Sequence, residues 1–176
     1  RYLVRSRGLG DVYKRQVEDI YEEEKHKASL IAKRDLIILK ISELQRDAKI
    51  GLLYILNYVT NPTKRINVLS KQSDSYLVVH LNKYHEGSTM SRMYEIITKM
   101  NTENMVISGL LLEMCGLGVC TINAGSFFHK EERLGKDLKE AVAFLRQEKG
   151  SPKLVLFNET RNKYIQQTGT DTESVV

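Results

Sequence analysis

The chain has 176 residues, of which 41% are hydrophobic and 28% are charged, an ordinary composition for one globular domain or two small ones. No apolar run approaches the roughly 18 residues of a membrane-spanning helix and no signal peptide is evident, so we expect a cytoplasmic protein that does not enter a membrane. Two cysteines are too few for a disulfide framework, which agrees with a reducing compartment.

The net charge of +5 comes mostly from the first sixteen residues. This segment, RYLVRSRGLGDVYKRQ, resembles a translated sequencing-library adapter and holds five basic residues and one acid. We therefore expect residues 1–16 to be a non-native leader, and the chain to be a fragment of a longer protein. Because the rest of the chain is nearly neutral, charge alone gives no argument for binding nucleic acid.

Residues 17–100 are expected to form a helical region. Apolar residues recur at steps of three or four from Ile37 to Val59, which is the spacing of an amphipathic helix. Gly51 is expected to break this stretch into two helices. The helical pattern should end before Pro62, because the residue that precedes a proline avoids the helical conformation.

A short apolar run, YLVVHL at residues 76–81, follows in the same region. Its β-branched and aromatic residues suit a buried strand, but a short helix fits equally well at this length. After a Gly-Ser-Thr turn, Ser88 or Thr89 is expected to cap a helix with an apolar stripe that runs from Met90 to Met100.

Residues 101–165 are expected to form an α/β region. Residues 110–114 predict a strand or a buried helix, and residues 119–123 predict a strand after a glycine turn. Residues 131–149 carry apolar side chains at helical spacing, and KLVLFN at residues 153–158 predicts a strand. A helix followed by a turn and a strand favours a small parallel sheet.

The expected fold class is therefore α+β or α/β, with a helical N-terminal half followed by a small α/β C-terminal half. The last residues, 166–176, are polar, and we expect them to be a disordered tail.

Two histidines in the helical region, His80 and His85, are the first candidates for chemistry. Histidine titrates near neutral pH and can act as a base, a metal ligand or a phosphate acceptor. A metal site needs three or four ligands, and the residues nearby show no recognised metal spacing, so we expect no metal. Taken alone, His80 also fits a structural histidine that forms a hydrogen bond at the end of an element.

The segment CGLGVCTINA at residues 115–124 supplies the other candidate ligand-binding residues, Cys115, Gly116, Gly118 and Thr121. A Gly-x-Gly turn can form a cradle of backbone N–H groups for an anion, and a thiolate at such a turn would have a lowered pKa. The segment is not a Walker A loop, because no Lys-Ser/Thr follows. The glycines equally fit a tight turn in a packed sheet, and both interpretations stay open.

The run DSYLVVHL, which begins at Asp74, resembles the histidine helix of PTS regulation domains, which control sugar-utilisation genes. In those domains a phosphorylatable histidine follows the pattern acidic-x-Tyr-Ile-Ala-Leu-His-Leu. The preceding segments LLYILNYV and RINVLSKQSD are similar to the preceding helix and connector of that domain. The resemblance covers roughly residues 52–81. It implies that His80 accepts a phosphoryl group and that residues 76–81 are helical.

Two neighbouring segments are similar to modules that accompany such domains. HEGSTMSRM, from His85, is similar to the His-x-x-Ser-Thr-x-Ser-x-Met run of mannose-class enzyme IIA modules, which implies phosphate on His85 with Ser88 and Thr89 as ligands. The segment from Cys115 to Thr121 is similar to the cysteine phosphate loop of enzyme IIB modules. Since His80 and His85 lie too close together for two complete modules, these interpretations compete.

We therefore expect a regulatory module of a PTS-linked transcriptional regulator, switched by histidine phosphorylation and without turnover or a cofactor. Its expected partners are a phosphocarrier protein and a second copy of the chain, with DNA or RNA bound only through a separate domain. Two alternatives stay open. One is an enzyme that binds a nucleotide or phosphorylated ligand at residues 115–126, and the other is a nucleic-acid-binding protein of a mobile element that uses Lys64, Arg65 and residues 33–49.

Overall fold

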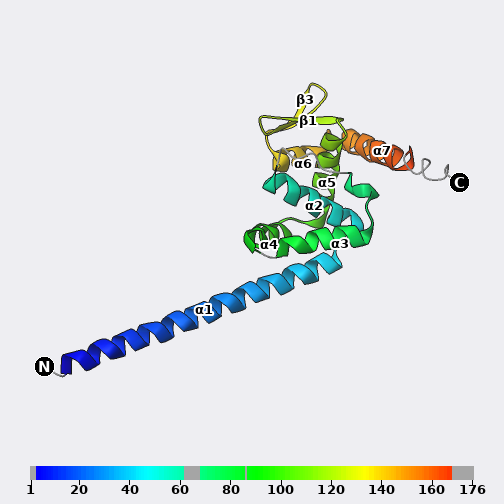
Figure 1. Cartoon of the computed structure of the whole chain (residues 1–176). Coiled ribbons are helices and arrows are strands. Elements are labelled where there is room, and N and C mark those ends of the chain that lie inside the picture. Colours follow the sequence, from blue (N-terminus) through cyan, green and yellow to red (C-terminus); the bar gives the residue numbers. More distant parts are fainter. Residues whose placement is uncertain (1–2, 62–67, 86, 168–176) are drawn as a thin grey trace.

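The computed structural model describes residues 3–61, 68–85 and 87–167 of the chain. The described residues form seven α-helices, three short 3-10 helices and one three-stranded antiparallel sheet (Figure 1). The expectation of an α+β fold is confirmed, because helices make up the N-terminal half and the strands lie in the C-terminal part.

The chain begins with a long helix, α1 (Leu3–Glu43), which projects from the body of the molecule (Figure 1). Its last turns pack against the body through Ile37 and Ile41, which are almost fully buried. The next helix is α2 (Arg46–Thr60), so the break between the two helices lies at residues 44–45. The prediction of a break at Gly51 was therefore wrong.

Gly51 instead lies inside α2, where that helix crosses α5 (Thr102–Gly116). A Cβ atom at Gly51 would be 2.0 Å from the carbonyl oxygen of Met105, and one at Gly109 would be 2.4 Å from the Cα atom of Gly51. The two glycines thus allow the backbones to touch. This close pair of helices forms the centre of the body, and α5 is buried along most of its length.

The run at residues 76–81 belongs to a helix, α3 (Asp74–Asn82), so the strand interpretation was wrong and the helical one is confirmed. Ser73 caps this helix, because its hydroxyl oxygen accepts a hydrogen bond from the backbone N–H of Tyr76 at 3.2 Å. Leu77 and Leu81 lie one turn apart and are fully buried. A 3-10 turn, η1 (Leu69–Lys71), precedes the helix.

Two further 3-10 turns, η2 (Lys83–His85) and η3 (Gly87–Thr89), lead into α4 (Met90–Lys99). Met90, Met93 and Ile97 are the buried residues of α4, which confirms the predicted stripe. Thr89 stands at the N-cap position, but its side chain makes no capping hydrogen bond. The side chain of Ser88 lies outside the described part of the structure.

The three strands are β1 (Cys120–Asn123), β2 (Ser126–His129) and β3 (Glu132–Gly135), and neighbours along the chain pair antiparallel. The strand predicted at residues 119–123 is confirmed. The predicted parallel sheet was wrong, because two-residue turns connect these strands whereas a parallel pair needs a long crossover. In the first turn, Ala124 and Gly125 both have positive φ, as the common hairpin turns require.

The C-terminal helices are α6 (Leu138–Arg146) and α7 (Ser151–Gln167). The helix predicted over residues 131–149 is thus shorter, because β3 takes the first part of that range and Asp137 caps α6 by accepting from the N–H of Glu140 at 2.8 Å. Residues 153–158 lie in α7, so the predicted strand was wrong. Residues 166–167 also belong to α7, and residues 168–176 lie outside the described part.

One continuous apolar core joins the end of α1 to α7 and includes residues from both halves of the chain. Among the described helices, none combines the length and the continuous apolar character that a membrane-spanning helix needs.

Candidate functional site

The connector before α3 is held by Arg46, the first residue of α2. Its guanidinium group pairs with the Asp74 carboxylate and donates hydrogen bonds to the carbonyl oxygens of Ser70 at 3.1 Å and Gln72 at 2.5 Å. These contacts determine where α3 begins relative to α2. They therefore position His80, which lies in the last turn of α3.

His80 is half-buried, and its ring packs against the ring of Tyr76, one turn earlier, with 4.0 Å between the ring centroids. Burial, and secondarily the positive charge of Lys83, lower the pKa of His80 below its ordinary value. The imidazole is therefore neutral at pH 7. A neutral imidazole has one ring nitrogen with a free lone pair, which is the form that can attack a phosphorus atom.

The backbone of His85 ends η2, shortly after α3, and its side chain lies outside the described part of the structure. The chain thus places the two predicted phosphate acceptors on consecutive short helices. The Gly-Ser-Thr turn between them and α4 forms η3, in which Gly87 has a φ of +67°. Thr89, a predicted ligand residue, is half-buried at the start of α4.

The predicted anion cradle is the C-terminal end of α5. The N–H group of Leu117 donates to the carbonyl oxygen of Glu113 at 2.9 Å, that of Gly118 to Cys115 at 3.2 Å, and that of Val119 to Met114 at 2.9 Å. These three donors close the end of the helix and point back into it. A helix C-terminus also carries partial negative charge, which repels an anion.

The two thiols at this helix end lie close together. Cys115 is half-buried, and Cys120, the first residue of β1, is buried. A hydrogen bond with the Cys120 thiol and burial raise the pKa of Cys115, which is the opposite of the expected direction. Cys115 therefore stays a neutral thiol at pH 7 and lacks the reactivity of a thiolate.

The other predicted residues of the segment are exposed. Gly116 is the last residue of α5, Gly118 has a φ of +77° with open space around it, and Thr121 pairs with Phe128 in the sheet. Figure 1 places this helix end beside the sheet, on the other side of α2 from α3. The structure therefore does not bring the histidines and the Cys115 segment into one site.

A buried polar cluster was not predicted from the sequence. The hydroxyl group of Ser70 donates to the Glu113 carboxylate, and the N–H of Leu69 donates to the phenol oxygen of Tyr54 at 3.0 Å. Burial raises the pKa of Glu113, and burial together with Glu113 raises the pKa of Tyr54. Since Glu113 is only 1% exposed, the cluster joins α2, η1 and α5 rather than meeting a substrate. A single acid inside the apolar run MVISGLLLEMCGLGV was the available signal.

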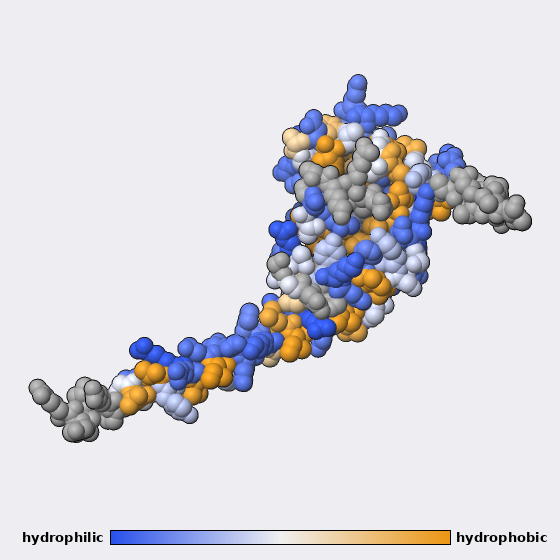
Figure 2. Space-filling view, in the orientation of Figure 1, coloured by the Kyte–Doolittle hydropathy of each residue, from blue (hydrophilic) through white to orange (hydrophobic). Residues whose placement is uncertain are grey.

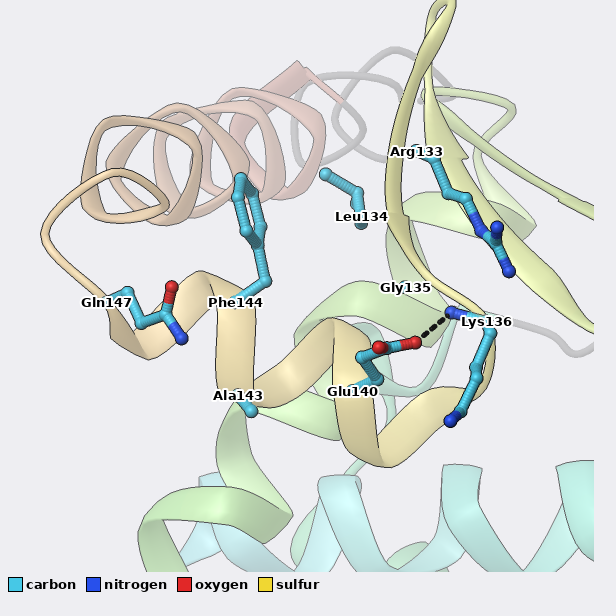
Figure 3. Close-up of a pocket in the computed structure, with 8 residues that line it drawn as sticks. All are labelled: Arg133, Leu134, Gly135, Lys136, Glu140, Ala143, Phe144 and Gln147. Carbon is cyan, nitrogen blue, oxygen red and sulfur yellow. Dashed lines mark hydrogen bonds between the residues drawn. The ribbon is translucent and has the colours of Figure 1, made fainter.

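A small hollow of about 260 Å³, lined by Leu117, Val119 and residues of α7, lies beside the predicted Cys115 segment. Two larger hollows lie away from the predicted site residues. One of about 430 Å³ lies between β3 and α6, and there the backbone N–H of Lys136 donates to the Glu140 carboxylate at 2.6 Å (Figure 3). A groove of about 530 Å³ lies between α2, α4, α5 and α6, with an apolar floor that includes Ile55 and Val142. Its charged rim is largely paired, since Lys99 contacts Glu95 at 2.7 Å.

Among the residues that the structure describes, no group of three or more histidine, cysteine or acidic side chains is placed to hold a metal ion. The chain matches no protein-family model, no curated protein and no solved structure.

Proposed function

We propose that this chain is a regulatory module that accepts a phosphoryl group on His80 from a phosphocarrier protein and responds to the added charge. The observation that supports the proposal is the combination of a helical α3 with a half-exposed, neutral His80 in its last turn. The resemblance to PTS regulation domains requires a helix at this position, and a strand there would have contradicted the resemblance.

The chemistry needs few protein groups, because the phosphocarrier supplies the activated phosphoryl group. A nitrogen–phosphorus bond forms at the His80 ring while the donor's own phosphoryl bond breaks. Tyr76 supports the ring from one side by stacking, and Lys83 follows in the next turn with a positive charge that favours a dianionic product.

Phosphate would add about two negative charges to α3 at neutral pH. This helix is packed on the end of α1 and on α2 through Leu77 and Leu81. A change in charge at its last turn therefore acts where three helices meet, which suits a switch better than a catalytic centre.

The proposal is tested by incubating the purified chain with radiolabelled phosphoenolpyruvate, enzyme I and the general phosphocarrier. We expect acid-labile, base-stable label on the chain, lost in His80→Ala. His129→Ala is the matched control, because His129 is buried in β2 and should not take the label. His85→Ala shows whether the second histidine contributes. No label, or label that persists when His80 and His85 are both replaced, would overturn the proposal.

The two alternatives have tests of their own. An enzyme that binds a nucleotide or phosphate at residues 115–126 should show a nucleotide-induced rise in melting temperature that Gly118→Val abolishes. The direction of the α5 end makes this alternative the weaker one.

A nucleic-acid-binding protein should bind DNA with an affinity that falls steeply with salt. Of its predicted basic face, Lys64 and Arg65 lie outside the described residues.

A further inference from the structure

The projecting part of α1 is surrounded by solvent. All residues from Gly8 to Ala32 are exposed, and the helix reaches the body only near its C-terminal end. A single helix in water is held together only weakly by its own hydrogen bonds, and most helices in proteins depend on an apolar face that is covered. The part of this helix after residue 16 lies outside the predicted leader.

An apolar stripe runs along this part of α1. We use that name for Val17, Tyr21, Ala28, Ile31 and Ile38. These residues recur at heptad spacing, with Glu24 and Asp35 at the two intervening positions. Tyr21 is 65% exposed and Ile31 is 59% exposed. Figure 2 shows apolar residues along the projecting helix with hydrophilic ones beside them. A repeat of this period is the seam of a left-handed coiled coil.

The apolar stripe does not face the body. At 100° per residue, Leu36 and Ile37, which pack in or against the core, lie about 130° around the helix from the middle of the stripe, and Ile41 lies about 100° from it. The stripe is therefore not the continuation of the core contact. It is a second face, and the described part of this chain does not cover it.

The charges beside the apolar stripe divide into two blocks. Residues 18–24 contain five acids and no base, whereas residues 25–34 contain four lysines or arginines and no acid. Within the single chain these blocks meet only in exposed pairs, such as Lys27 with Glu23 at 2.7 Å. Exposed pairs of this kind contribute little to stability, so they are free to exchange for pairs with another helix.

We propose that the apolar stripe pairs with the same stripe of a second copy of this chain, in antiparallel orientation. An antiparallel pair places the acidic block of each copy beside the basic block of the other. A parallel pair would place five acids against five acids and basic residues against basic residues. The charge pattern of α1 is therefore complementary to that of a second α1 that runs in the opposite direction.

The two acids that interrupt the apolar stripe fit antiparallel pairing of two copies. Glu24 and Asp35 occupy seam positions, where a polar residue lowers the stability of a coiled coil but restricts its register. The pair formed by α1 is therefore a modest, reversible contact rather than an obligate interface. The pairing does not require the proposed phosphorylation, since neither His80 nor its neighbours lie on the stripe.

Sedimentation equilibrium of the full chain at several concentrations and salt levels tests the inference. We expect a monomer–dimer equilibrium whose dissociation constant rises with added sodium chloride, because salt screens the attraction between opposite blocks. Parallel pairing would give the reverse dependence, since screening would relieve repulsion. A monomer at every concentration, a larger assembly, or a dimer that salt strengthens would each overturn the proposal.

A pair of charge-matched variants separates the apolar stripe from the rest of the helix. Tyr21→Gln with Ile31→Gln should raise the dissociation constant at least about a hundredfold, since each of the two copies loses two buried apolar contacts. His26→Gln with Ser29→Gln places the same side chains on the far side of α1, leaves the lysines, arginines and acids of both blocks unchanged, and should leave a dimer. A dimer that survives the first variant would refute the stripe as its interface. The salt response of the unmodified chain remains a test if that variant does not fold.

Discussion

Replacing Gly51 with alanine should destabilise the protein, although alanine is the better helix former. The new Cβ atom would lie 2.0 Å from the carbonyl oxygen and 2.6 Å from the carbonyl carbon of Met105. Ordinary contacts between carbon atoms are about 3.5–4.0 Å. The neighbour is backbone and cannot rotate away, so α2 and α5 would have to move apart.

Two opposing terms determine the size of the effect. Alanine in a helix interior is favoured over glycine by about 1 kcal/mol. Overpacking of a tight core costs typically about 1–3 kcal/mol, and a clash between backbones belongs at the upper end or beyond. We therefore expect Gly51→Ala to lower the free energy of unfolding by about 2 kcal/mol. Gly109→Ala should have a similar effect, because its Cβ would lie 2.4 Å from the Cα atom of Gly51.

Urea denaturation followed by circular dichroism measures these changes. The double variant should lose clearly less than the sum of the two single losses, because helices that have moved apart for one methyl group have room for the other. Gly10→Ala is the control, since its Cβ would meet nothing within 4 Å. Unchanged or increased stability in Gly51→Ala, or strict additivity in the double variant, would refute the close crossing.

Three further predictions concern single side chains. Burial raises the pKa of Glu113 above its ordinary 4.5, so the free energy of unfolding should fall as the pH rises from about 4.5 towards the raised value. Glu113→Gln should remove this fall when the free energy of unfolding is measured at pH 4 and at pH 7. Asp137→Ala should lower the free energy of unfolding by about 1 kcal/mol through loss of the α6 cap, whereas the exposed Lys139→Ala should change it little in the same urea titration. In an NMR titration His80 should have a midpoint below 6.5, and Tyr76→Ala should raise that midpoint by exposing the ring; a midpoint above 6.5 would contradict the burial described.

Two short apolar runs show where sequence patterns stop being informative. YLVVHL and KLVLFN have the same length and a similar composition, and both are helical. In the second run Leu154 is half-buried and Phe157 is fully buried, while the intervening Val155 and Leu156 are exposed, so packing selected the helical face. A local signal for this helix lies just before the run. Pro152 stands in the first turn of α7, where proline is well tolerated.

Gly51 marks a different limit. A glycine in a helical pattern carries a local cost, which favours a break, and the reason to accept that cost lies far away in the sequence at Gly109. No local pattern contains this information. By contrast, the strand at β1 and the buried face of α4 follow from local spacing alone, and both were predicted correctly.

The candidate site was predictable only where it depends on local features of the sequence. The cap at Ser73 and the spacing of Leu77 and Leu81 are local features that indicate a helix carrying His80. The environment of Cys115 depends on α5 continuing to Gly116, which makes the segment a helix end rather than a helix start. That distinction reverses the sign of the helix dipole at the proposed cradle, and a Gly-x-Gly pattern carries no information about it.

The two proposals meet at the C-terminal end of α1. That end packs against α3 and α4, while the apolar stripe of the same helix faces outward. A regulatory module needs an element with two states, and an equilibrium between free and paired α1 would be such an element. Phosphate on α3 can shift that equilibrium only if it interacts differently with the two states. The contact between α3 and α1 is the place in this fold where that difference could arise. A modest pairing energy is then an advantage. If the dimer were very stable, about two added charges could not shift the equilibrium between free and paired α1 measurably.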